Sequence, residues 1–402
     1  MGGKLKNKKN YTSLRPSTKC IHAGGPEDPW RALTPPLYQT STFTFQDFDQ
    51  VDRVLKGEED GFVYGRMGNP TTDRFEKLVS ELEEGEKTRS FASGMGAISA
   101  ILIHLAKKHP EIAFPKVLYG GTRAFIEQYL IPSGCLIHWF DPREEGWDEE
   151  LSRRLSPDTG AIFAETPSNP VMTVIDLEKL SSVAKKVGAP LVVDNTFATP
   201  ILQKPLVLGA DIVVHSATKY LGGHGDLLGG TVTGKASLID RLSFEEGSYL
   251  GATLSPFNAW LLLRGMKTLP LRMDAHCRGA MMVAEFLSGH PGVKSVHYPG
   301  LSKDPGHKIA SSQMKGFGGM LSFSLGDDQR ARRVASGLEL FKIAVSLGDP
   351  ESLIEHPASL SHRQMTAEER MALGIDPGFL RVSVGLEDPE DLVLDLKRAL
   401  ER

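Results

Sequence analysis

The stretch from Leu191 to Lys219 constrains this chain more than any other, because it holds two short apolar runs that each lead to a reactive side chain. The first run, Leu191 to Val193, is followed by Asp194, and the second, Asp211 to Val214, leads to Lys219. Runs of this length, joined by a turn and a helical segment, are typical of strands buried in a parallel sheet. Ligands of open α/β sheets lie beyond the carboxyl ends of the strands, so we expect Asp194 and Lys219 to meet in one crevice.

A carboxylate and a lysine that converge in this way suit pyridoxal phosphate. The lysine amine can hold the cofactor aldehyde as a Schiff base, and the carboxylate can keep the pyridine nitrogen protonated, so that the ring withdraws electrons from the substrate. Ser216 and Thr218 would then flank the cofactor phosphate. The alternative stays open at this point, because a lysine after a strand is most often a solvated surface residue and a strand-end aspartate commonly caps the next helix.

The segment from Ser93 to Ala97 has the composition of a phosphate cradle. Its sequence, SGMGA, follows a short expected strand at residues 90–92 and precedes an apolar expected helix at residues 98–107. Serine is a good helix N-cap, and the glycines allow backbone N–H groups to approach an anion at the positive end of the helix. A simple capped helix with small residues is the alternative.

Strands and helices alternate on both sides of these motifs, which indicates a doubly wound, mostly parallel sheet. Besides residues 90–92, strands are expected at residues 116–119, 136–140, 161–165, 191–193, 211–214 and 230–233. Helices are expected at residues 71–84, 98–107, 123–131, 148–155 and 177–187. The strand ends would deliver Tyr119, Asn169, Asp194 and Lys219 to a common edge of the sheet.

A long helix over residues 256–287, kinked at Pro270, is expected to lead into a smaller α/β unit. Strands are expected there at residues 293–296, 320–324, 343–345 and 380–384, and helices at residues 329–338, 367–373 and 389–400. Arg381 lies inside the last strand, where an unpaired cation would be costly. Its partner is either a structural carboxylate or the carboxylate of a substrate, gripped by two N–H groups at once.

Length and composition exclude several classes of protein. The 402 residues suit two or three domains, and 40% hydrophobic with 24% charged residues is ordinary for a globular enzyme. A net charge of −4 gives no reason to expect nucleic acid as a partner, and no apolar run reaches the roughly 18 residues of a membrane span. Three widely separated cysteines indicate neither a disulfide framework nor zinc, and they fit a reducing cytoplasm.

Other ligands find less support in the sequence. His224 and Asp226 lie in a glycine-rich loop, but two candidate ligands there are poor evidence for a metal. A nucleotide-binding sheet is the competing interpretation of the alternating pattern. No GxGxxG motif opens a helix after an early strand, and no GxxxxGK[ST] motif occurs, so neither nucleotide signature supports it.

The first 63 residues differ from the rest, because they carry scattered aromatic side chains and no sustained periodicity. We expect residues 1–63 to form an arm that lies across another subunit, although a surface layer on its own chain is the alternative. The turn-rich joint Tyr64-Gly65-Arg66 follows the arm. A large cofactor-binding domain is expected over residues 64–262 and a smaller C-terminal domain over residues 263–402.

Taken together, the motifs resemble the Cys/Met-metabolism family of pyridoxal-phosphate enzymes, which includes methionine and cystathionine γ-lyases, cystathionine β-lyases and cystathionine γ-synthases. The resemblance runs from about Pro16 to the end of the chain. It rests on the segments SGMGA, LYGGT, ETPSNP, VVDNTFATP, HSATKYLGGHGD and RVSVGLED. It implies the fold of the aspartate aminotransferase type, fold type I, in which a smaller C-terminal α/β domain follows a large doubly wound domain.

The resemblance also implies roles for single residues. Lys219 would be the Schiff-base lysine, Asp194 the partner of the pyridine nitrogen, and Tyr119 a ring-stacking residue that acts as an acid. Asn169 would contact the 3-hydroxyl of the cofactor. The cofactor phosphate would be bound by Gly94, Met95, Ser216 and Thr218, and by Tyr64 and Arg66 of the neighbouring subunit. Ser346 and Arg381 would hold the substrate carboxylate. An active dimer, and a homotetramer built from two such dimers, are therefore expected.

The implied reaction is γ-elimination from L-methionine and related sulfur amino acids, which releases a thiol, 2-oxobutyrate and ammonia. Val345 stands where cystathionine-cleaving γ-lyases tend to carry a glutamate, and an apolar valine fits a methyl thioether better. Gly121 stands where typical methionine γ-lyases have a cysteine, and Gly247-Ser248 where they have a Lys-Asp pair. Cystathionine γ-lyase or γ-synthase therefore remains the alternative. Burial and the cofactor charge are expected to lower the pKa values of both Lys219 and Tyr119.

Overall fold

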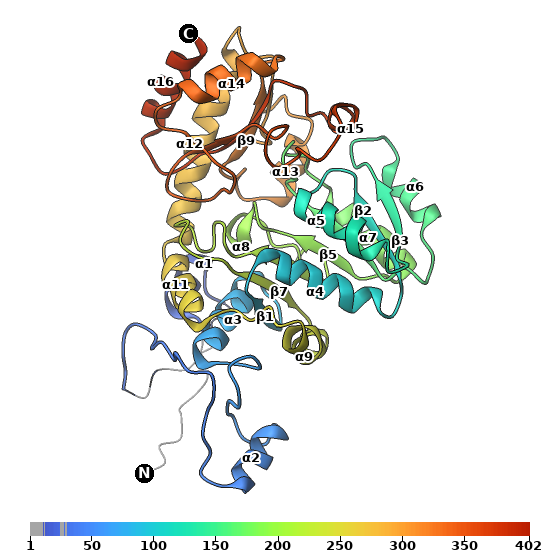
Figure 1. The fold of residues 1–402 in the computed structure, drawn as a ribbon, viewed down its shortest axis with the longest axis vertical. Helices are drawn as coiled ribbons and strands as arrows, with labels where there is room; N and C mark the ends of the chain where they lie inside the picture. Colours follow the sequence, from blue (N-terminus) through green and yellow to red (C-terminus); the bar gives the residue numbers. More distant parts are fainter. Residues whose placement is uncertain (1–10, 12, 25–27, 29) are drawn as a thin grey trace.

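The computed structural model describes residue 11, residues 13–24, residue 28 and residues 30–402. Within these residues the chain forms a seven-stranded sheet in the order β1-β7-β6-β5-β4-β2-β3 and a five-stranded sheet in the order β10-β11-β12-β9-β8. The long helix α12 (Leu269–Gly289) runs beside the smaller sheet, which lies above the larger one in Figure 1. No helix in the described ranges is both long and apolar enough to cross a membrane.

The larger sheet confirms the predicted doubly wound, mostly parallel arrangement, because β7 alone runs antiparallel to its neighbours. Its strands are β1 (Lys87–Phe91), β2 (Glu111–Pro115), β3 (Leu136–Phe140), β4 (Ala161–Glu165), β5 (Leu191–Asp194), β6 (Ile212–Ser216) and β7 (Gly230–Gly234). Its helices are α3 (Pro70–Glu83), α4 (Gly94–Ala106), α5 (Gly120–Phe125) with a π-helical turn at Ile126–Leu130, α6 (Trp147–Arg154), α7 (Leu177–Val187), α8 (Thr199–Leu202), α9 (Ala236–Phe244), α10 (Glu246–Tyr249) and α11 (Pro256–Met266).

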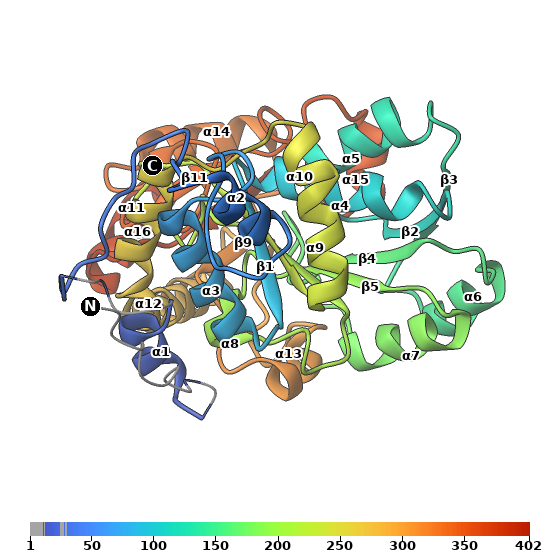
Figure 2. The same cartoon turned by 90° about the horizontal axis from the view of Figure 1, so that it is seen from below.

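Alternate side chains of the central strands enter the cores on the two faces of the large sheet. On β4, Phe163 packs into the core beside α4, whereas Ile162 packs into the core beside α6 and α7. On β5, Val192 packs into the core beside α4, and Val193 packs into the core beside α6 and α7. Figure 2 shows α4 and α7 on opposite sides of these two strands. Both faces are covered, which is why the sequence of each strand is a continuous apolar run rather than an alternation.

The smaller sheet is mostly antiparallel, and only β10 and β11 pair in parallel. Its strands are β8 (Ser295–His297), β9 (Met320–Ser324), β10 (Lys342–Ile343), β11 (Leu353–Glu355) and β12 (Phe379–Ser383), and the helices of this region are α13 (His307–Gln313), α14 (Asp328–Gly337), α15 (Ala367–Ala372) and α16 (Pro389–Leu400). Val283 of α12, Phe323 of β9 and Leu396 of α16 pack in one core. Helices on one face of this sheet therefore give it its own hydrophobic core.

Several predicted elements differ from the observed ones in place or length, and the physical reason is clear for three of them. The strand expected at residues 116–119 is β2, which ends at Pro115, because two apolar runs flank this proline and periodicity could not choose between them. The single helix expected at residues 256–287 is two helices, with Pro270 in the first turn of α12, where its missing N–H is tolerated. The strand expected at residues 343–345 ends at Ile343, and Ser346 then adopts a φ of 86°.

The N-terminal segment contains α1 (Pro16–His22), which contacts α3 and α12, and α2 (Phe48–Leu55). Residues 1–10, 12, 25–27 and 29 of the expected arm lie outside the described residues. The part around α2 projects below the rest of the molecule in Figure 1. Helix α2 buries no residue, and Phe48 is 88% exposed. The side chains of Phe48 and Leu55 on α2 are therefore left uncovered by their own chain.

Candidate active site

A cavity of about 540 Å³, here named cavity A, lies at the carboxyl ends of the parallel strands of the large sheet. Residues from the strand β12 and from the loop after β10 complete its wall. It brings together most of the predicted site residues, namely Gly94, Met95, Tyr119, Asn169, Asp194, Ser216, Thr218, Lys219, Ser346 and Arg381. Tyr64 and Arg66 instead line a second cavity of about 380 Å³, named cavity B.

Lys219 follows β6 and points its amine at the opposite wall of cavity A. Its Nζ donates to Oγ of Ser346 at 2.8 Å. Burial, followed by the positive charge of Arg381, lowers the pKa of Lys219 to about 8, in the predicted direction. A useful fraction of this amine is therefore neutral near neutral pH, as a nucleophile or a base must be.

Asp194 ends β5 and is 7% exposed. Its Oδ1 accepts from the backbone N–H of Thr196 at 2.9 Å and from the hydroxyl of Thr196 at 2.5 Å. Burial raises the pKa of Asp194 in spite of these two bonds, because a buried carboxylate lacks compensation from water. A protonated ring nitrogen in cavity A would supply the positive charge that stabilises the ionised form.

The wall formed by α4 has the features of an anion site. Ser93 caps this helix, and its Oγ accepts from the backbone N–H of Gly96 at 3.0 Å. A Cβ atom at Gly94 would lie 2.6 Å from Cβ of Ser216, so only glycine allows the helix to come this close to β6. Helix N–H groups and the hydroxyls of Ser216 and Thr218 thus surround a space suited to a phosphate.

Arg381 lies on β12 and is 4% exposed. Its Nη1 donates to Oδ1 of Asn169 at 2.9 Å, and its Nη2 donates to the backbone oxygen of Ser346 at 2.7 Å. The same Nη2 lies 3.0 Å from Oε2 of Glu355, a buried carboxylate. Its Nε is buried without a hydrogen-bond partner in the described part of the chain. The arginine therefore has a structural partner and still keeps one free donor.

Tyr119 lies beyond β2 rather than on the predicted strand, and it is 43% exposed. Its backbone N–H donates to Oε2 of Glu165 at 2.8 Å. Burial, and then the charge of Glu165, raise the pKa of Tyr119, so the predicted lowering is wrong for the protein environment itself. Burial disfavours the charged form of any group, which lowers the pKa of an amine but raises that of a phenol.

Glu165, Thr196 and Glu355 are among the side chains that line cavity A and were not predicted from the sequence. Glu165 carried a usable signal, because it ends β4 as Asp194 ends β5, and the two are register partners on neighbouring parallel strands. Glu355 carried none, since it lies on the three-residue strand β11, which is too short to show an alternating pattern.

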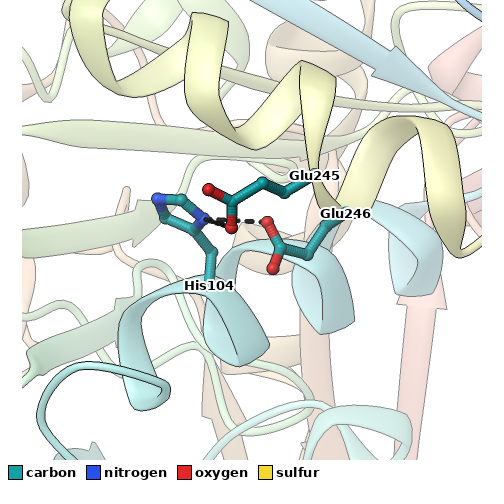
Figure 3. A group of neighbouring side chains, drawn as sticks. All are labelled: His104, Glu245 and Glu246. Atoms are coloured by element: carbon teal, nitrogen blue, oxygen red, sulfur yellow. Dashed lines mark hydrogen bonds and ion pairs between the residues drawn. The ribbon is translucent and has the colours of Figure 1, made fainter.

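A second polar cluster, away from cavity A, consists of His104, Glu245 and Glu246 (Figure 3). Nδ1 of His104 lies 2.8 Å from Oε2 of Glu246 and 3.8 Å from Oε2 of Glu245. Nζ of Lys107 lies 2.5 Å from Oε1 of Glu246, so the buried acid already has a cationic partner. The cluster joins α4 to α10, whose Ser248 backbone oxygen accepts from Nη1 of Arg66 at 2.7 Å.

Comparisons with known proteins agree over almost the whole chain. Residues 17–401 match the family described as Cys/Met metabolism PLP-dependent enzyme. An L-methionine gamma-lyase of Fusobacterium nucleatum subsp. polymorphum is 45% identical over 388 residues, covering 96% of this chain and 98% of that protein. A cystathionine gamma-lyase of Bacillus subtilis (strain 168) is 43% identical over 390 residues, covering 96% of this chain and 100% of its own length. A solved structure from Campylobacter jejuni that holds N'-pyridoxyl-lysine-5'-monophosphate has a TM-score of 0.92 at 34% identity, covering 97% of this chain and 100% of that one.

Proposed function

Since this chain belongs to the Cys/Met metabolism family of pyridoxal-phosphate-dependent enzymes, we propose that it catalyses γ-elimination from L-methionine and related sulfur amino acids. It is a carbon–sulfur lyase with a fold of type I, and its products from methionine are methanethiol, 2-oxobutyrate and ammonia. One observation carries the proposal, which is that Lys219, Asp194 and Arg381 line a single cavity.

The chemistry of the side chains in cavity A fits pyridoxal phosphate. The N-terminus of α4 with Ser216 and Thr218 suits the phosphate, and Asp194 suits a protonated ring nitrogen. Asn169 accepts from Arg381 through its amide oxygen, which leaves its NH₂ group to donate to the oxygen of a 3-hydroxyl. When bound, the cofactor supplies an electron sink for the α-carbon of the substrate.

The side chains of cavity A divide the remaining work. Lys219, whose pKa is lowered, takes the α-proton of the substrate on Nζ and delivers it to a neighbouring carbon atom. Oγ of Ser346 accepts a hydrogen bond from this amine and keeps it in place. Arg381, in the wall of cavity A, binds the substrate carboxylate, which orients the α-carbon toward Lys219. Tyr119 keeps its proton at neutral pH because its pKa is raised, so its hydroxyl can protonate the leaving thiolate.

The wall of cavity A around Val345 favours a methyl thioether over a charged side chain. Val345 is 56% exposed, and Leu228 and Leu360 also line the cavity with exposed apolar surface. The second candidate substrate is cystathionine, because Gly121, which lines cavity A, stands where typical methionine γ-lyases have a cysteine. A Cβ atom there would lie 2.5 Å from Cε1 of Tyr119, so the tyrosine ring lies in the space that a larger residue would need.

The proposal includes an oligomer, because two of the expected phosphate-binding residues lie outside cavity A. Tyr64 and Arg66 line cavity B, outside cavity A, where the arm meets the body of the chain. A partner subunit would bring these two residues to the phosphate of the neighbouring cavity A. The arm of residues 1–63 would cover the partner through side chains such as Phe48, giving an active dimer and a homotetramer of two dimers. The three unpaired thiols support a cytoplasmic location.

One assay separates the two substrates. The purified protein is loaded with pyridoxal phosphate and given methionine, homocysteine, cysteine or cystathionine, and the thiol and 2-oxo acid products are measured. Release of methanethiol and 2-oxobutyrate from methionine is expected. Cysteine release from cystathionine with methionine untouched would contradict the proposal. Lys219→Ala is the control, because it is expected to lose both the yellow chromophore and borohydride trapping of the cofactor.

A further inference from the structure

Glu165 has no assigned role, yet it is a carboxyl group in the wall of cavity A that joins two site residues. It is 4% exposed and ends β4. Its Oε2 accepts from the backbone N–H of Tyr119 at 2.8 Å, and its Oε1 accepts from the backbone N–H of Asn169 at 2.7 Å. Each oxygen thus accepts a hydrogen bond from a different loop, one after β2 and one after β4. No other described side chain hydrogen-bonds to both of these N–H groups.

The surroundings of Glu165 couple its charge to the rest of the site. Its register partner on β5 is Asp194, a second buried acid. The charges of Asp194 on β5 and Arg381 on β12 act on this carboxyl group, and its own charge acts on the phenol of Tyr119. Burial, and then the charge of Asp194, raise the pKa of Glu165 to about 8. Two buried carboxyl groups on neighbouring strands do not both ionise readily, which is why the charge of Asp194 raises the pKa of Glu165.

We infer that Glu165 is a positioning residue: its two carboxyl oxygens set the spacing of Tyr119 and Asn169 across cavity A, and its charge acts on the phenol of Tyr119. The inference rests on the proposed function, because it assigns roles to residues that face the cofactor there. Glu165 would thus act in two ways, through the reach of its side chain and through its charge, and substitutions can distinguish them. Reach depends on the length of the side chain, whereas the electrostatic effect on Tyr119 depends on its ionisation.

Three variants separate these effects. Glu165→Gln removes the charge and leaves only one oxygen to accept, and Glu165→Asp keeps the charge but shortens the reach. Glu76→Gln is the matched control, because Glu76 is also a carboxyl that accepts the N–H and the hydroxyl of one residue, Ser90, but at a site outside the lining of cavity A. Each variant is loaded with pyridoxal phosphate, and kcat, KM and the dissociation constant of the cofactor are measured against pH.

The titration of Tyr119 gives a readout that is independent of turnover. Ultraviolet phenolate absorbance of the loaded protein is followed against pH, and the same curve for Tyr119→Phe is subtracted. In Glu165→Gln the phenol is expected to ionise at lower pH than in the unsubstituted protein, because a nearby negative charge has been removed. The alkaline limb of kcat/KM should move the same way. In Glu165→Asp the phenol should titrate as in the unsubstituted protein, while kcat falls about 10-fold to 100-fold.

The possible results are distinct. An unchanged phenol titration and unchanged kcat in Glu165→Gln, with normal cofactor binding, would overturn the inference and leave the proposed function intact. Failure of the unsubstituted protein to bind pyridoxal phosphate would instead remove the proposed function. If Glu165→Gln does not fold, Glu165→Asp decides, because kcat equal to that of Glu76→Gln would show that reach is unimportant. If Glu165→Gln lowers kcat but leaves the alkaline limb of the kcat/KM profile at the same pH, the inferred effect of the Glu165 charge on Tyr119 would be overturned.

Discussion

At the scale of single residues, the lowered pKa of Lys219 makes a direct prediction about cofactor uptake. Only the neutral amine attacks an aldehyde, and burial with the charge of Arg381 brings the pKa of Lys219 from 10.5 to about 8. The rate of covalent uptake by the cofactor-free protein should therefore rise with pH and reach half its maximum near pH 8. Rapid-mixing absorbance measures it, with Lys219→Ala as the blank. A half-maximum near the ordinary lysine value would show that the amine is not desolvated.

At the same scale, some residues of the site could be predicted from the sequence and others could not. Asp194 and Lys219 could be placed in one cavity because both follow buried parallel strands, and the carboxyl ends of such strands share an edge. Their catalytic roles remain proposals. The network behind them could not be placed, because Glu355 reaches Arg381 only through the pairing of β11 with β12. The direction of the Tyr119 pKa was predictable in principle, since burial alone settles its sign.

At the scale of elements, the contact between α4 and α10 is expected to depend on Glu246. Its side chain is 1% exposed and lies against both His104 and Lys107, whereas that of Glu245 is 43% exposed. Glu246→Gln should lower the free energy of unfolding by about 1–3 kcal/mol, because it leaves buried polar groups poorly paired. Glu245→Gln should cost less than about 0.5 kcal/mol. Urea unfolding at one protein concentration compares them, and equal losses would contradict this assignment.

Elements whose apolar run is bounded by cap or turn residues were predicted well, and strands of two or three residues were not. Helix α7 and strands β4 and β9 have the predicted ends, because caps or turn residues bound a clear apolar run. Strand β11 was missed, and β10 was placed one residue late and one residue too long. Two or three residues carry no period, so pairing with neighbouring strands decides whether they are extended. Pro270 was read as a kink because the apolar pattern continues on both sides of it, although a proline is also common in the first turn of a helix.

At the scale of the whole molecule, the arm was predicted from its lack of periodicity, and its contact with a partner remains a proposal. The described part of the arm leaves Trp30, Leu33 and Phe48 at least 88% exposed. A single chain gains nothing from ordering such a segment in water, since exposed apolar side chains are stabilised only when they are covered. The alternative of a surface layer on its own chain finds no support in α2, which buries no residue.

The proposed sharing of residues between subunits predicts complementation between two inactive variants. Arg66→Ala removes the guanidinium that lines cavity B, and Lys219→Ala removes the amine of cavity A. If each active site takes Lys219 from one chain and Arg66 from its partner, a mixed dimer holds one site with both residues intact. Equal amounts, dissociated and reassembled at random, should then recover about one quarter of the unsubstituted activity. The control is the double variant Arg66→Ala with Lys219→Ala, mixed with the unsubstituted protein, in which each mixed dimer has both of its sites damaged. Absence of recovery in reassembled dimers would place Arg66 and Lys219 in the same chain's site and remove the reason for an obligatory dimer.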